Sequence, residues 1–140
     1  MKRAFVLIVI LSIGSATVFA HHGRGATYDT KRQIALKGTV SQLLWRNPHI
    51  AIFIDVMKGD DGKVVTWAIE HSNISQLARL GYGKNTLQVG MNVTAYVNPG
   101  GKGEPIGLCQ KIILADGKEI FQRDDLPPNL RRGAAGLKVD

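Results

Sequence analysis

Apolar and polar residues alternate along several stretches of the chain, and this two-residue period predicts β-strands that are buried on one face. The first stretch is Gln33–Leu44, and the next two are Ile50–Val56 and Val65–Glu70. A fourth strand is expected at Val93–Val97 and a fifth at Leu108–Leu114. Five short stretches of this kind, bounded by turn residues, are typical of a small, mainly β domain.

The period changes between the third and fourth of these strands. Apolar residues from Ile74 to Leu80 have the spacing of one face of a short helix. Ser72 or Asn73 is a suitable N-cap residue, and Gly81 follows where a helix of this length would end. Three strands, one helix and two strands is the element order of the OB-fold. We therefore predict a mainly β protein, a small OB-like Greek-key barrel with one short helix between strands three and four, with a β-sandwich as the alternative.

Glycine, asparagine and proline mark the places where the predicted strands bend or turn. Gly38 interrupts the first strand, which indicates a bulge or a sharp bend at a barrel corner. The turn within Trp45–His49 and the loop Asn98–Pro105 join strands one to two and four to five. In OB-folds these two loops flank the usual ligand-binding face. A tight turn and a short returning strand, Glu119–Phe121, follow the fifth strand.

The first twenty residues have the pattern of a secretory signal peptide. Lys2 and Arg3 precede an apolar run, Ala4–Ile13, and small residues then lead to a cleavage site after Ala20. The apolar run is too short for a stable membrane anchor, which is the alternative interpretation. We therefore expect a periplasmic or secreted protein with no membrane anchor after cleavage.

The mature chain then divides into three parts. Residues 21–32 are expected to form an N-terminal arm, in which Tyr28 is the one large apolar side chain that can tie the arm to the body. Residues 33–121 form the barrel domain. Residues 122–140 contain prolines, glycines and few apolar residues, and we predict a disordered tail.

The distribution of charge and the number of cysteines exclude some functions and one source of stability. Signal cleavage removes two positive charges from a formal net charge of +7, and the remaining charges are scattered and of both signs. Aromatic residues make up 6% of the chain, so no basic stripe with interleaved aromatics is present and we predict no nucleic-acid partner. Cys109 is the only cysteine, which excludes an intramolecular disulfide. Stability must therefore come from packing.

Six short motifs stand out along the chain. They are His21-His22, Tyr28-Asp29, Leu36-Lys37-Gly38-Thr39-Val40, Asn47-Pro48-His49, Trp67-Ala68-Ile69-Glu70 and Leu87-Gln88-Val89-Gly90. With these motifs the chain resembles, over roughly residues 20 to 121, a family of small exported bacterial proteins of unknown function. The resemblance implies an exported, barrel-like domain, and it supplies no activity. The Arg131-Arg132 pair lies outside the pattern.

Three of the four histidines are candidate metal ligands. Cleavage after Ala20 leaves a free α-amine on His21, and this amine and the His21 imidazole can chelate one ion. His22 or His49 can add a further nitrogen. Nitrogen-rich sites of this kind suit Cu(II), with Ni(II) or Zn(II) as alternatives. The competing interpretation is that the His21-His22 pair has no working role and that His49 bonds a neighbouring backbone group in its turn.

Other side chains have a functional and a structural interpretation. Glu70 is expected either to accept a hydrogen bond from a histidine and orient it, or to pair with a lysine or cap the helix. His71 is expected to be exposed or to act as a cap. Cys109 is expected to be a buried, inert thiol, with a soft Cu(I) ligand as the alternative. Trp67 is in step with the buried face of its strand, so we expect it in the core.

The turn between the first two strands carries the candidate partner-binding residues Trp45, Arg46 and Asn47. They underlie an alternative function, in which the barrel loops bind a periplasmic protein or a glycan and the histidines are structural. No hydrolase or phosphate-loop motif is present. We therefore expect a non-enzymatic binding module, although a copper oxidase with an N-terminal histidine stays open. The favoured ligand is a transition-metal ion, copper or another divalent metal, bound through the mature N-terminus.

Overall fold

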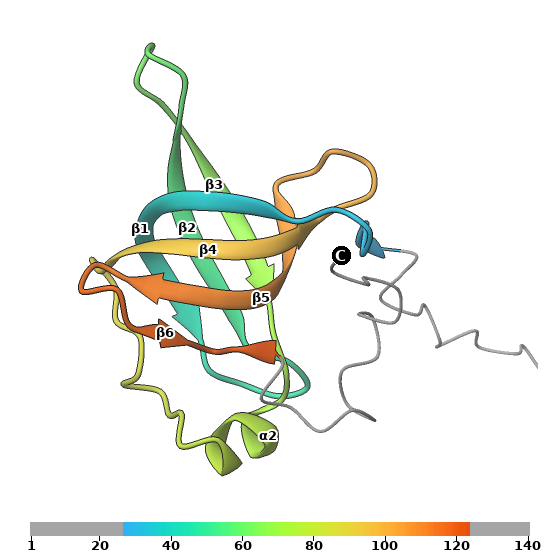
Figure 1. Ribbon diagram of the computed structural model, residues 1–140, viewed down its shortest axis with the longest axis vertical. Helices are drawn as coiled ribbons and strands as arrows, with labels where there is room; N and C mark the ends of the chain where they lie inside the picture. Colours follow the sequence, from blue (N-terminus) through green and yellow to red (C-terminus); the bar gives the residue numbers. More distant parts are fainter. Residues whose placement is uncertain (1–26, 124–140) are drawn as a thin grey trace, which may run out of the picture.

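Six strands and the helix α2 account for most of residues 27–123, the part of the chain that this computed structural model describes (Figure 1). Strands β2 and β3 form a hairpin that extends beyond the rest of the sheet (Figure 1). In chain order the elements are β1 (Ile34–Leu44), β2 (Ala51–Lys58), β3 (Lys63–Glu70), α2 (Ile74–Arg79), β4 (Asn92–Pro99), β5 (Ile106–Leu114) and β6 (Glu119–Ile120).

The sheet closes on itself. Its strand order is β3-β2-β1-β4-β5-β6, and an additional pairing joins β3 to β5. This closing contact is parallel and pairs Ala68 with Ile106 and Glu70 with Leu108. A closed five-stranded barrel with α2 between β3 and β4 confirms the OB-like prediction over the β-sandwich. Closure also removes exposed strand edges, which otherwise invite association with other chains.

Strand β1 is bent and pairs with two different partners. Its first half pairs with β4 up to Thr39, and its second half pairs with β2 from Thr39 onward. The register with β2 shifts between Val40 and Gln42, so the bulge lies just after Gly38 rather than at it. Gly38 has a different task, since a Cβ there would lie 2.2 Å from the backbone oxygen of Asp55. The glycine therefore allows the backbones of β1 and β2 to approach closely at the bend.

Gly38→Ala should destabilise the barrel, because the added methyl meets backbone atoms that cannot rotate away. We expect the free energy of unfolding to fall by about 2 kcal/mol, a typical cost of overpacking. Urea denaturation of the two proteins measures the difference. Gly83→Ala is the matched control, since nothing lies within 4 Å of a Cβ at Gly83. Equal stability of the two alanine variants would contradict the close-approach explanation.

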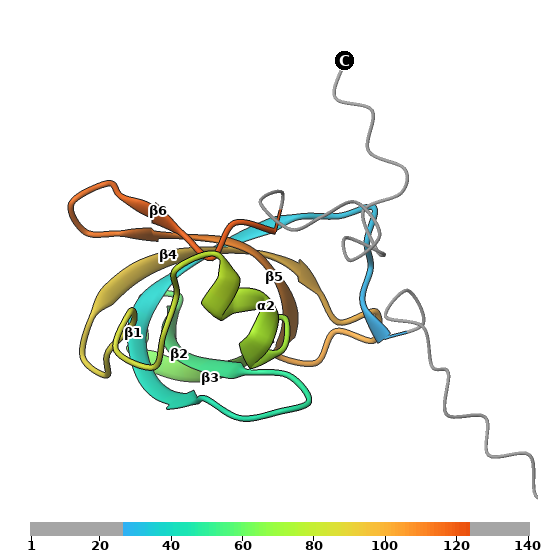
Figure 2. The ribbon, with the colours of Figure 1, turned by 90° about the horizontal axis from the view of Figure 1, so that it is seen from below.

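The barrel interior holds the alternating apolar residues of the five strands, as the sequence pattern predicted. Helix α2 lies across one end of the barrel (Figure 2), and Leu77 is fully buried there. The side chain of Asn73 accepts a hydrogen bond from the backbone N–H of Gln76, which confirms the predicted N-cap. Gly81 follows the helix with a φ of 83°, a left-handed conformation that favours glycine. The core residues include Val40, Ile52, Ile54, Ile69, Val93, Ala95, Val97, Leu108 and Ile112.

Two residues that follow β6 are buried against the barrel. Phe121 is fully buried, and Arg123 is 2% exposed. The Arg123 Nε donates a hydrogen bond of 2.8 Å to the backbone oxygen of Cys109. This hydrogen bond joins the chain that follows β6 to β5. The rest of the predicted tail, the signal peptide and residues 21–26 of the arm lie outside the described residues. Between residues 27 and 123, no helix has the length and apolar character needed to cross a membrane.

Candidate functional site

A cavity of about 330 Å³ lies where the loop between β1 and β2 meets the end of β3 and the start of β5. This is one side of the loop-flanked face at which OB-folds usually bind ligands. The predicted second loop is shorter than expected, because Asn98 and Pro99 belong to β4 and pair with β5. The residues around the cavity are Tyr28, Leu44, Arg46, Asn47, Pro48, His49, Ile50, Ala51, Ala68, Ile69, Glu70 and Ile106.

Tyr28 attaches the N-terminal arm to the barrel at this cavity. The residue is 7% exposed and forms a β-bridge with Gly100 in the loop after β4. On either side of it, the Asp29 N–H donates to the Pro99 oxygen at 2.8 Å, and the Gly101 N–H donates to the Thr27 oxygen at 3.0 Å. These contacts confirm the predicted role of Tyr28 as the tie between arm and body.

One carboxylate joins two of the motifs that were singled out in the sequence. Glu70, at the end of β3, accepts a hydrogen bond of 3.0 Å from the Tyr28 hydroxyl on its Oε2 atom. Its Oε1 atom lies 3.2 Å from Nδ1 of His49. The β2–β3 register explains the contact, because Glu70 pairs with Ala51 and so lies beside the start of β2. Glu70 therefore contacts a histidine, and its role in orienting that histidine stays a prediction.

The three partner-binding candidates of the turn have different positions. Arg46 and Asn47 are exposed and line the cavity. Asn47 also contacts α2, since its Oδ1 accepts a hydrogen bond of 3.3 Å from the Ile74 N–H. Trp45 is only partly exposed and packs toward Phe121, with ring centroids 6.5 Å apart. Trp45 therefore combines a contact with the barrel end and a part that stays exposed, and its role in partner binding stays a prediction.

His71 is fully buried, which corrects the expectation of an exposed or capping residue. The Ser72 N–H donates to its Nδ1 at 2.6 Å, so the ring proton is on Nε2, which donates to the Phe121 oxygen at 2.8 Å. Continuing the alternation beyond Ile69 points His71 toward the interior, and this signal was available in the sequence. The residue links the end of β3 to the chain that follows β6.

Cys109 is a buried thiol, as expected. Burial raises the pKa of Cys109 to about 12, and the nearby Arg123 guanidinium opposes this rise only in part. A thiol with so high a pKa is not ionised in neutral solution. Since the thiolate is the form that binds metals, the Cu(I)-ligand alternative for Cys109 has no support.

The raised Cys109 pKa predicts a loss of stability at high pH. The unfolded chain releases the thiol proton near the ordinary value of 9.0, whereas the folded protein keeps it up to about 12. Stability is therefore complete below pH 9 and falls as pH rises above it, by on the order of 1 kcal/mol at pH 10 from this group. Urea denaturation at pH 8 and pH 10 measures the change. Cys109→Ala should lose less stability over this interval, and an identical loss in both proteins would contradict the assignment.

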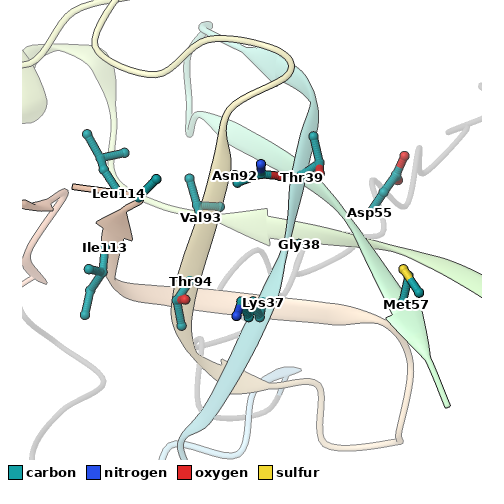
Figure 3. Close-up of a pocket in the computed structure, with 11 residues that line it drawn as sticks. Lys37, Gly38, Thr39, Asp55, Met57, Asn92, Val93, Thr94, Ile113 and Leu114 are labelled. Atoms are coloured by element: carbon teal, nitrogen blue, oxygen red, sulfur yellow. Dashed lines mark hydrogen bonds between the residues drawn. The ribbon is translucent and has the colours of Figure 1, made fainter. Parts of the chain in front are cut away.

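A second and larger concavity, of about 710 Å³, is lined by residues of β1 and β2 and by the start of β4 and the end of β5 (Figure 3). Three of its polar residues already have hydrogen-bond partners on the barrel. Thr39 donates to Asn92 at 2.8 Å, and Asp55 accepts from Ser41 at 3.1 Å and from Thr66 at 2.6 Å. Lys37 and Asp55 are the charged residues of its lining. No catalytic or metal-ligating constellation is present among these side chains, so we favour the cavity beside His49.

The metal ligands predicted from the sequence are only partly described. His49 is 41% exposed at its side chain and lies at the cavity, whereas His21 and His22 are outside the described residues. Among residues 27–123, no group of three histidine, cysteine or acidic side chains is placed to hold a metal ion. His49 would therefore need ligands from the arm to complete a site.

The fold and this loop-flanked cavity place the protein in the class of small OB-like barrels. The chain belongs to a family of unknown function, DUF6152, whose model matches residues 9–110. A crystal structure of Rim1, a mitochondrial single-stranded DNA-binding protein from S. cerevisiae, is similar to this barrel, with 14% sequence identity and a TM-score of 0.47. That similarity covers 60% of this chain and 93% of the other. None of the curated proteins matches the sequence.

Proposed function

We propose that this protein is an exported, non-enzymatic module that binds a transition-metal ion, copper or another divalent metal. The ligands are the α-amine and imidazole of His21, the imidazole of His22 and that of His49. Signal cleavage after Ala20 creates the amine, and the basic and apolar segments of residues 1–20 support export to the periplasm or beyond.

The attachment of the arm beside His49 is the observation that carries the proposal. The Tyr28 hydroxyl and the His49 imidazole contact the same carboxylate, that of Glu70. His22 precedes Tyr28 by six residues, and a chain of that length spans up to about 20 Å when extended. Tyr28 therefore attaches the arm to the barrel next to His49. The chain that joins Tyr28 to His21 and His22 is long enough for both histidines to reach His49.

The donor set determines which metals suit the site. An α-amine and imidazole nitrogens are borderline ligands that favour Cu(II), and copper leads the affinity order of the divalent first-row metals. These ligands bind only in their unprotonated forms, so metal binding should release protons and weaken in acid. Ni(II) and Zn(II) are the alternatives with the same ligands.

The cavity itself supports a second candidate function, the binding of a periplasmic protein or a glycan. Its rim combines the exposed side chains of Arg46 and Asn47 with the apolar surfaces of Pro48 and Ile106. A mixture of a few polar groups with apolar walls is typical of ligand pockets. In this alternative His49 is a structural residue of the turn.

Two measurements on the exported protein test the metal proposal. Intact mass spectrometry should give a mature form that begins at His21. Copper titration, followed by the visible absorption of Cu(II), should then show saturation at one equivalent. A mature form with another first residue, or binding that does not saturate at a fixed ratio, would refute the proposed site. A pull-down with periplasmic proteins and a glycan array would then test the second candidate.

A further inference from the structure

We infer that the free edge of β3, Lys63–Trp67, is an interface at which a second copy of this chain adds its own β3 in antiparallel orientation. The two hairpins would then form one four-stranded sheet. This interface is independent of the proposed metal site, because it uses none of the proposed ligands.

Strand β3 has partners on both sides over only part of its length. Strand β2 pairs with all of β3, from Lys63 to Glu70, whereas β5 pairs only with Ala68–Glu70. The β2–β3 hairpin extends beyond the rest of the sheet (Figure 1). Within the part of the chain that the structure describes, no strand pairs with Lys63–Trp67 on the side away from β2. Closure of the barrel therefore protects the edge of β3 only from Ala68 onward.

The backbone groups of this edge are arranged so that the edge can pair with itself. The Ala68 N–H donates to the Pro105 oxygen at 2.9 Å, so it points away from β2. Alternate residues of a strand direct their N–H and C=O groups to the same side, so those of Val64 and Thr66 also point away from β2. Val64 opposite Thr66 of the second copy would exchange both hydrogen bonds, and so would the reverse pair. The two-fold axis then passes between the two Val65 residues.

The side chains complement each other in this two-fold register. Strand β2 pairs Val56 with Val65, and both are half-buried. The axis therefore places Val56 and Val65 of each copy in one row across four strands. On the other face, Val64 is 54% exposed and lies opposite Met57, which is 70% exposed. In the dimer Val64 gains Thr66 of the second copy as its other neighbour, and β-branched residues that face each other across strands stabilise a sheet.

Composition and charge also favour a second copy as the occupant. The four residues after Lys63 are valine, valine, threonine and tryptophan, which favour strands, and Lys63 is the only charge on the edge. Exposed edges in natural proteins usually carry charges, prolines or bulges that prevent such pairing. In the two-fold register, Lys63 of the second copy lies opposite Trp67. The exposed Glu104 precedes Pro105, which bonds the residue after Trp67, so opposite charges come close together.

Self-association of the full mature chain tests this interface. So short an edge makes a small contact, and we expect a weak dimer that is rare at about 10 µM and abundant toward about 1 mM. Sedimentation equilibrium measures the association constant, and EDTA in the buffer excludes bridging by metal ions. Because EDTA is present, the result does not depend on whether the protein binds copper.

Two lysine substitutions separate the β3 edge from the rest of the hairpin. Val64→Lys brings positive charges of the two copies together beside the axis and should weaken the dimer at least about tenfold. Met57→Lys is the matched control, since it adds the same charge to an exposed apolar position on β2 and should associate as wild type does. Equal weakening in the two variants would overturn the proposed interface. A wild type that stays monomeric would also overturn it, and would leave a strand of another protein as the occupant of this edge.

A disulfide tests the register. The two Val65 residues face each other as a non-hydrogen-bonded pair, with Cα atoms about 4.5 Å apart, a separation that a disulfide can span. Mild oxidation of Val65→Cys at high concentration should therefore give a covalent dimer on a non-reducing gel. Cys109 is buried and stays unreactive, and Met57→Cys, exposed on the neighbouring strand, should give little dimer. Equal crosslinking of the two variants, or none in Val65→Cys, would overturn the two-fold register.

Discussion

Phe121→Ala should be the most destabilising of the substitutions considered for this protein, with a loss of about 4 kcal/mol in the free energy of unfolding. Phe121 directly follows β6 and is fully buried. Its ring centroid is 4.8 Å from that of Tyr82, 5.8 Å from that of His71 and 6.5 Å from that of Trp45. Removing the ring leaves a cavity that these neighbours cannot fill.

The backbone of Phe121 has an unusual conformation. Its φ of 53° is in the left-handed region, which is uncommon for an aromatic residue. The surrounding packing and the hydrogen bond from His71 to the Phe121 oxygen hold this conformation in place. A residue kept in a sparsely populated conformation indicates that its side-chain contacts outweigh the backbone cost.

Urea denaturation of the mature protein measures the effect. Phe121→Leu should lose about 1.5 kcal/mol, since it keeps much of the volume, and it gives a value if the alanine variant does not fold. Val64→Ala is the control, because Val64 is 54% exposed and should change stability little. A buried phenylalanine usually costs about 3 to 5 kcal/mol when it is replaced by alanine. A loss below about 1 kcal/mol in Phe121→Ala would therefore contradict the burial of the Phe121 ring.

The second large effect concerns His21. Replacing His21 with alanine, or placing one extra residue before it, should weaken Cu(II) binding at least about 100-fold. Loss of a residue that only supports a metal ligand usually lowers metal affinity about 10- to 100-fold. His21 supplies two ligand atoms in the proposed site, so its loss should have a larger effect. The extension keeps every side chain and removes only the free amine from its position, so it isolates the contribution of the terminus.

Isothermal titration calorimetry of the mature proteins gives the affinities. Gln42→Ala, at an exposed position of β1, is the control and should bind as wild type does. His49→Ala separates the arm from the barrel, because it removes the one ligand that the barrel provides. Wild-type affinity in both the His21→Ala and the extended protein would refute a metal site at the N-terminus. Loss in these two proteins but not in His49→Ala would place the metal on the arm alone.

Local periodicity was enough to predict the elements of the barrel. The alternation in Ile50–Val56 and Val65–Glu70 and the helical spacing after Asn73 each appear in the structure close to the expected bounds. The prediction of these elements succeeds because strand and helix periods are properties of consecutive residues. An element that is buried on one side has apolar residues at that period in the sequence. The sequence also marked Gly38 as a position where the first strand bends. The reason for a glycine there is the close approach of the Asp55 backbone, which is visible only when both strands are in place.

The sequence by itself determined the order of strands and helix, the apolar face of each, and the chemistry available at His21, His22, His49 and Glu70. Only the tertiary structure decided which of these groups meet. The β2–β3 register brings Glu70 to His49, and the pairing of Tyr28 with Gly100 brings the arm to the same carboxylate. It also placed His71 and Phe121 together inside the barrel end. The physical reason is that such contacts join residues tens of positions apart, and their geometry follows from barrel closure rather than from any local pattern.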